Sequence, residues 1–178
     1  MYLLFFIVLI SFSAFFSASE IALFSLSQGK IQELLQQQLI GSIYVWRLRQ
    51  NAQNLLATIL IGNNIVNTLC ASLATVLAVK YFGDYGIGIA TGLATLLLLM
   101  FGEILPKSIA QKNNVYIALK VAPILWFLNR LLFPLVWLLN HFNEFITTKL
   151  LKIKKTELVT EGEIRALARL GVEVGAID

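Results

Sequence analysis

Three long apolar runs constrain this chain more than any other feature. They cover about residues 2–26, 54–79 and 87–109. Each is long enough to cross a bilayer as an α-helix, which takes about 20 residues. Hydrophobic residues make up 58% of the chain and charged residues only 13%, whereas soluble domains are roughly 45–50% apolar. The sequence therefore predicts an all-α membrane protein with three transmembrane helices.

A fourth apolar region, residues 115–148, is interrupted by Lys120, Arg130, Pro123 and Pro134. A charge at the bilayer centre costs about 2.5–3.5 kcal/mol on the insertion scale. We therefore interpret this region as amphipathic, proline-kinked helices at the inner membrane surface, with aromatic side chains in the interfacial zone. An ordinary fourth span is the alternative interpretation.

The basic residues indicate an orientation, because cytoplasmic flanks carry the excess of Lys and Arg. With three spans and the N-terminus outside, Lys80 is the only basic residue on the outer side. A fourth span would instead export the basic cluster at 149–155. We expect a multi-pass protein of the inner (plasma) membrane with a cytoplasmic C-terminus. The polar segment 29–52 then forms further juxtamembrane helices.

Polar side chains recur inside the first two spans. Ser13, Ser17 and Glu20 share one helical face, and Asn63 and Asn67 share another. A rise of roughly 1.5 Å per residue puts Ser17 and Asn63 about 14 Å from the cytoplasmic ends of their spans. Intramembrane Ser also bonds its own helix, and Asn also bridges helices, so purely structural roles remain open.

The third span ends with a carboxylate and a proline, in the stretch "FGEILPKSIA" at 101–110. Pro106 lacks an N–H and clashes with the carbonyl four residues back, which belongs to Gly102. At membrane depth that carbonyl needs another partner, and Glu103 lies beside it. Hydroxyl, amide, carboxylate and carbonyl oxygens are hard donors that suit Mg²⁺ or Na⁺.

Several other classes of site are disfavoured by composition. The chain has one Cys, Cys70, which excludes a disulfide framework or a multi-Cys zinc site. It has one His, His141, far in sequence from every intramembrane Ser, so a serine hydrolase lacks a base. We expect no enzyme activity and no nucleic-acid binding.

Three ordered motifs, "FSASEIALFS" (16–25), "IGNNIVNT" (61–68) and "FGEILPKSIA" (101–110), resemble the transmembrane domain of the CorC/CNNM family of magnesium transporters. The resemblance implies a homodimer with three spans, a proline-kinked juxtamembrane belt and a cytosolic helical bundle. The belt matches residues 115–148.

The same resemblance implies a Mg²⁺ site between the spans. Its ligands would be Ser17, Asn63, Asn67, Glu103 and the carbonyl of Gly102. Secondary candidates are Ser19, Glu20 and Asn64, and the expected helix kinks are at Pro106, Pro123 and Pro134.

The expected domain organisation is a transmembrane domain over residues 1–150 and the start of a cytosolic helical linker over 151–178. A short natural tail is the alternative for the second segment. The nucleotide-binding CBS pair of the family would lie beyond this sequence, so ATP would act only through that missing part.

The resemblance implies Mg²⁺ transport, as export coupled to Na⁺ entry by alternating access. The alternative is a Mg²⁺ sensor or scaffold that regulates other transporters without moving the ion itself. Both functions need a cation site, so the sequence does not separate them.

Overall fold

The structure, a computed structural model, describes residues 2–83 and 87–145. Most of the described residues are helical, and none of them lies in a strand. The helices, in chain order, are α1 (Tyr2–Phe24), α2 (Gln28–Gln36), α3 (Ser42–Gln50), α4 (Ala52–Phe82), α5 (Ile87–Leu97), the π-helical segment η2 (Leu98–Ile104), α6 (Leu105–Lys112), α7 (Asn114–Leu131) and α8 (Phe133–Phe145).

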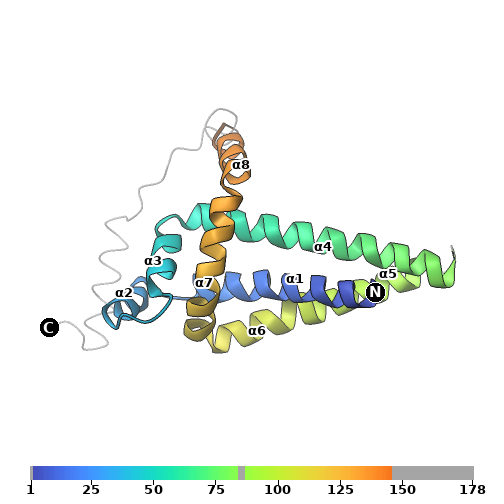
Figure 1. Cartoon of the computed structure of the whole chain (residues 1–178), viewed down its shortest axis with the longest axis horizontal. Helices are drawn as coiled ribbons and strands as arrows, with labels where there is room; N and C mark the ends of the chain where they lie inside the picture. The colour runs from blue at the N-terminus through green and yellow to red at the C-terminus, as the bar shows by residue number, and fades with distance from the viewer. Residues whose placement is uncertain (1, 84–86, 146–178) are drawn as a thin grey trace, which may run out of the picture. The chain divides into compact units, whose positions relative to one another are not determined.

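Three helical stretches are long and apolar enough to cross a membrane: Leu4–Phe24, Ala52–Tyr81 and Ile87–Lys112. This confirms the three predicted spans, although the second and third extend a few residues beyond the predicted ends. α1 packs against α4, η2 and α6, and α4 packs against α5. Figure 1 shows these long helices running alongside one another.

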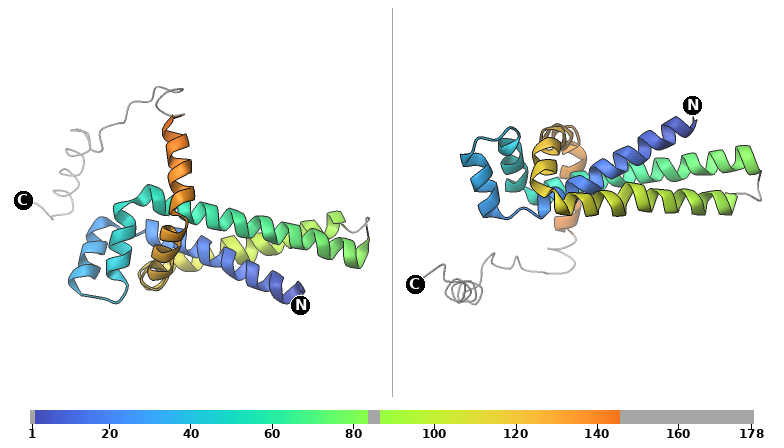
Figure 2. Two further views of the ribbon diagram at one scale, coloured as in Figure 1. Left: turned by 45° about the horizontal axis from the view of Figure 1, so that its top comes forward. Right: turned by 90° about the horizontal axis from the view of Figure 1, so that it is seen from below.

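The predicted belt region forms two helices that meet at a bend of 70° between Leu131 and Phe133. Pro134 follows this break directly, whereas α7 runs through Pro123 without interruption. The bent pair would pass as one span by length and composition alone. However, α7 contacts both α1 and α4 and runs across them, not alongside (Figures 1 and 2).

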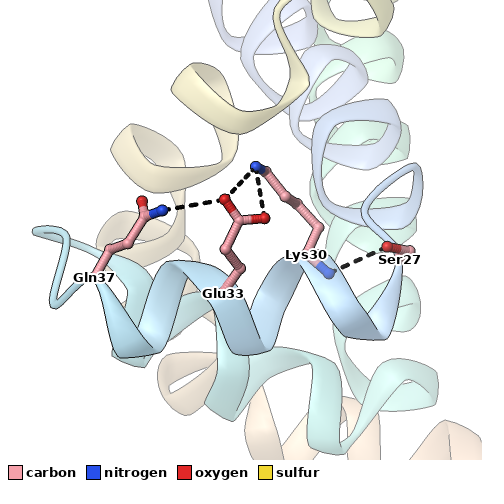
Figure 3. A network of polar contacts seen from close by, with 4 residues as sticks. All are labelled: Ser27, Lys30, Glu33 and Gln37. Atoms are coloured by element: carbon pink, nitrogen blue, oxygen red, sulfur yellow. Dashed lines mark hydrogen bonds and ion pairs between the residues drawn. The ribbon is translucent and has the colours of Figure 1, made fainter.

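The polar segment after the first span folds into two short helices, α2 and α3. Ser27 caps α2, because its hydroxyl accepts a hydrogen bond from the Lys30 backbone N–H at 3.2 Å. Lys30 Nζ then pairs with Glu33 at 2.8 Å, and Gln37 donates to the same carboxylate (Figure 3). The hydrogen bond from Lys30 lowers the pKa of Glu33 below its ordinary value.

The start of α3 depends on a glycine. Gly41 has φ +96°, and a Cβ there would overlap the backbone carbonyl of Leu119 in α7. That carbonyl lies four residues before Pro123, which has no N–H to offer it. The Cα of Gly41 therefore packs directly on a carbonyl that the proline leaves without its usual helical partner.

The hydrophobic core gathers where α1, α2, α3, α4 and α7 meet. Its largest fully buried side chains include Leu23, Ile31, Leu34, Leu48 and Leu125. By contrast, the helices of the spans expose many large apolar side chains, as expected for surfaces that face lipid.

One compact unit covers Met1–Leu139. The expected boundary at residue 150 lies outside the described residues. The expected linker at 151–178 lies outside the described residues.

Candidate functional site

Polar groups from three helices converge on the hydroxyl of Ser13, which is fully buried in α1. Its Oγ lies 2.8 Å from Asn67 Oδ1 and 3.2 Å from Asn63 Oδ1, both on α4. It also lies 3.4 Å from the carbonyl oxygen of Gly102 in η2. A hydroxyl carries one proton, so it donates to one of these three acceptors at a time. The single proton of Ser13 therefore satisfies only one of the three acceptor oxygens around it at a time.

Asn67 connects this cluster to the carboxylate of the third span. Its Nδ2 donates a hydrogen bond of 2.9 Å to Glu103 Oε1, while its Oδ1 faces Ser13. One amide side chain on α4 thus contacts both α1 and η2. We call Ser13, Asn63, Asn67, Gly102 and Glu103 the polar cluster.

The backbone around Gly102 and Glu103 is π-helical over Leu98–Ile104. The N–H of Leu105 bonds the carbonyl of Met100, five residues back. Pro106 follows directly, within the first turn of α6. A π turn before a proline rearranges the carbonyls that the ring would otherwise meet, and such turns are frequent at functional sites. The helix kink expected at Pro106 stays a prediction; the structure has a π-helical turn directly before this proline, within the continuous helical stretch Ile87–Lys112.

Gly102 lets the helices approach closely at this point. A Cβ added there would lie 2.9 Å from Ser13 Oγ and 3.1 Å from Leu98 Cδ1. Any side chain at position 102 would therefore push α1 away from η2 and cover the carbonyl oxygen.

Ser17, one turn along α1, is 1% exposed, and its Oγ has no hydrogen-bond partner among the described residues. A buried hydroxyl without a partner costs free energy, about 1–3 kcal/mol in mutational data. Ser17 thus offers an unused polar atom on the same helical face as Ser13.

Glu20, one turn further along, lies beside a cation. Its Oε2 is 3.1 Å from Lys107 Nζ, which joins α1 to α6 next to Pro106. Both side chains are partly exposed. The pair lies about 10 Å along α1 from Ser13, given a rise of roughly 1.5 Å per residue.

The other two secondary candidates point elsewhere. The Ser19 hydroxyl donates to the carbonyl of Phe15 at 2.6 Å within α1, which is the structural role left open above. Asn64 is exposed on α4, whereas its neighbours Asn63 and Asn67 face the polar cluster.

The arrangement is suited to a small, hard cation. It brings together a hydroxyl, two amide oxygens, a backbone carbonyl and a carboxylate, the donor types that Mg²⁺ and Na⁺ favour. Among the described residues, no group of three or more His, Cys, Asp and Glu side chains is placed to hold a metal. Four of the five oxygen-bearing groups in the polar cluster are neutral, and only the Glu103 carboxylate can carry a charge.

Ser13 is absent from the ligand set predicted from the sequence. That set includes Ser17, although periodicity puts both residues on one helical face. The face follows from helical periodicity, whereas the height at which α1 meets Gly102 depends on how the helices pack. The signal that favoured Ser13 was its i, i+4 spacing from Ser17 on that face.

Comparison with known proteins adds an independent finding. A family model described as "Cyclin M transmembrane N-terminal domain" matches residues 4–178. The chain is 36% identical to the UPF0053 inner membrane protein YfjD of Escherichia coli, over 85% of this chain and 35% of that protein. It is 35% identical to a UPF0053 protein of Synechocystis, over 97% of this chain and 49% of that protein. A UPF0053 protein of Haemophilus influenzae is 38% identical over 78% of this chain. The chain spans a third to a half of the length of these relatives.

Proposed function

Because this chain belongs to the family of the cyclin M transmembrane N-terminal domain, we propose that it is the membrane-embedded part of a magnesium transporter. In this proposal Mg²⁺ is the substrate, and the polar cluster binds it between α1, α4 and η2. Export of Mg²⁺ is coupled to entry of Na⁺, and the site opens to each side of the membrane in turn.

The observation that carries the proposal is the surplus of acceptor oxygens around Ser13. Three acceptors lie within 3.4 Å of one hydroxyl. A cation among them would be bound by oxygens that a single proton cannot satisfy. Glu103 would supply the negative charge, and a direct carboxylate contact helps to offset the loss of water from Mg²⁺.

The orientation proposed from the charges agrees with the positions of the helix ends. α1 ends at Phe24, α4 begins at Ala52, and α6 ends at Lys112. Each of these ends has a basic residue nearby: Lys30 after α1, Arg49 before α4 and Lys112 at the end of α6. Lys80 lies near the opposite end of α4. We place the Lys107 end of the spans in the cytoplasm of a cell whose inner membrane holds the protein.

Self-association is part of the proposal and rests on exposed features of the second and third spans. Asn64 exposes its amide near the middle of α4, and an amide facing hydrocarbon lacks partners. A Cβ at Gly88 or Gly92 would meet nothing within 4 Å, so this GxxxG spacing on α5 is open to a neighbouring helix. A second copy of the chain would cover these features.

The test is thermal unfolding of the purified chain with and without Mg²⁺. At a concentration about 100 times Kd, a bound ligand adds about 2.7 kcal/mol to the free energy of unfolding. We expect Mg²⁺ to raise Tm in the wild type and not in Glu103→Gln. Glu33→Gln removes an exposed carboxylate from α2 and is the matched control. Equal stabilisation of all three proteins would contradict a site at Glu103.

Transport itself is tested by Mg²⁺ flux in liposomes that hold the full-length protein. Flux that requires both Glu103 and a Na⁺ gradient supports coupled export. Mg²⁺ binding without flux would favour the sensor or scaffold instead.

A further inference from the structure

A small hollow lies between α1, α4 and α5, on the side of the polar cluster away from Pro106 and Lys107. Its wall includes Phe6 from α1, Cys70 from α4, and Thr91, Thr95 and Leu98 from α5 and the start of η2. Cys70 is one turn beyond Asn67 on α4, so the hollow continues along the helix that carries two members of the cluster.

Leu98 separates the hollow from the polar cluster. Its side chain lines the hollow, and its Cδ1 lies 3.1 Å from the position that a Cβ of Gly102 would take. It is also the first residue of the π-helical segment. The apolar side chain of Leu98 therefore lies between the hollow and the Gly102 part of the polar cluster.

The hollow has a mostly apolar lining, in which the hydroxyls of Thr91 and Thr95 are the polar side-chain groups. Three alanines complete its wall, namely Ala71, Ala74 and Ala94. The Thr91 Oγ1 is buried and has no hydrogen-bond partner among the described residues, while the Thr91 carbonyl accepts from Thr95 Oγ1 at 2.8 Å. Hydroxyls along a passage can exchange hydrogen bonds with moving water without holding an ion tightly.

The hollow is narrow in this conformation. Its cavity volume of about 20 Å³ accommodates about one water molecule. Mg²⁺ usually keeps several of its waters when it binds to a protein. The ion could therefore not pass through the hollow without a separation of the helices.

We infer that this hollow is the collapsed outer half of the cation's pathway and that Leu98 is the barrier between it and the polar cluster. This inference rests on the proposed function, because it assigns the hollow to the route of the same ion. The inference assigns to Leu98 the control of ion movement between the polar cluster and the hollow. It also predicts that the ion leaves the cluster through the hollow.

Cys70 is the only cysteine in the chain and lines the hollow, so it reports on water access there. The experiment measures the rate at which a charged, membrane-impermeant methanethiosulfonate modifies Cys70 in vesicles, with the reagent on the Lys107 side. We expect Leu98→Ala to raise this rate at least about tenfold. Leu98→Phe should leave it at or below the wild-type rate.

Leu96→Ala is the matched control, because Leu96 is 60% exposed and does not line the hollow. Cys70→Ser gives the background of the assay. Should Leu98→Ala not fold, Leu98→Val makes a smaller opening and should give a smaller rise. An unchanged rate in a folded Leu98 variant would overturn the inference, as would an equal rise in Leu96→Ala.

The two proposals fail in different measurements. The proposed function fails if Glu103→Gln keeps its stabilisation by Mg²⁺. The role of Leu98 fails if the rate of Cys70 modification does not change in a variant that still binds Mg²⁺.

Discussion

Asn67 of α4 donates a hydrogen bond of 2.9 Å to the carboxylate of Glu103 in η2. The oxygen of the same amide accepts a hydrogen bond from Ser13 in α1. The Asn67 side chain of the second span is therefore bonded to both the first and the third span. An amide presents a donor at one end and an acceptor at the other, and here each end meets its complement. The bond between Asn67 and Glu103 therefore holds the carboxylate in the polar cluster.

Replacing Asn67 with Leu should remove both contacts. We expect a loss of about 1–2 kcal/mol of unfolding free energy, because the Glu103 carboxylate loses a donor. Stabilisation by Mg²⁺ should also disappear. Asn64→Leu changes the same residue type one turn away on the exposed face and should retain the response. Thermal unfolding of both variants with and without Mg²⁺ checks this, and an equal response would remove Asn67 from the site.

Gly102→Ala tests the close approach of α1 and η2. The new Cβ would lie 2.9 Å from Ser13 Oγ. We expect a loss of about 1–3 kcal/mol from overpacking, together with weaker Mg²⁺ binding. Gly29→Ala in α2 is the control, since nothing lies within 4 Å of its added Cβ and the residue lies outside the proposed contact between copies. It should keep or gain up to about 1 kcal/mol through helix propensity. Chemical unfolding in detergent measures both, and similar values for the two variants would contradict this packing.

Gly41→Ala tests the contact between α3 and α7. Its φ of +96° is unfavourable for alanine, and the Cβ would overlap the Leu119 carbonyl. We expect a loss of about 2–5 kcal/mol, the sum of backbone strain and overpacking. Gly29→Ala, in the first turn of α2 with open space around it, should be nearly neutral or stabilising. Unfolding curves distinguish the two, and a neutral Gly41→Ala would show that α3 does not need this close approach.

The Glu33 carboxylate should make the stability of the fold depend on pH in a defined direction. Lys30 lowers the pKa of Glu33 from its ordinary value of 4.5, so the carboxylate stabilises the fold above that pH. This contribution should be lost as the pH falls through the lowered folded-state pKa. The Tm difference between the wild type and Glu33→Gln should therefore shrink on acidification below 4.5. It should also shrink with added salt, because the pair is exposed. A difference that grows on acidification would contradict this assignment.

The number of spans and the residue types of the candidate site followed from the sequence. Runs of about 20 apolar residues admit few structures in a bilayer, because every backbone group must be satisfied within the segment. Polar residues within such runs are costly, which is why Asn67 and Glu103 could be identified without coordinates. The proline at position 106 predicted a helix kink and a freed carbonyl at Gly102, whereas the π-helical form of the turn is known only from the structure.

Tertiary structure decided which of these polar groups meet. Periodicity placed Ser13, Ser17 and Glu20 on one face of α1, but it does not give the height at which that face meets Gly102. Packing of α1 on α4 and η2 puts Ser13 at the polar cluster and pairs Glu20 with Lys107, while the Ser17 hydroxyl has no hydrogen-bond partner within residues 2–83 and 87–145. The sequence by itself determined the spans and their polar faces, because these depend on local periodicity and on the cost of burying polar groups in lipid. Contacts between helices depend on the shapes of all the side chains at their interfaces, so only the folded chain could decide them.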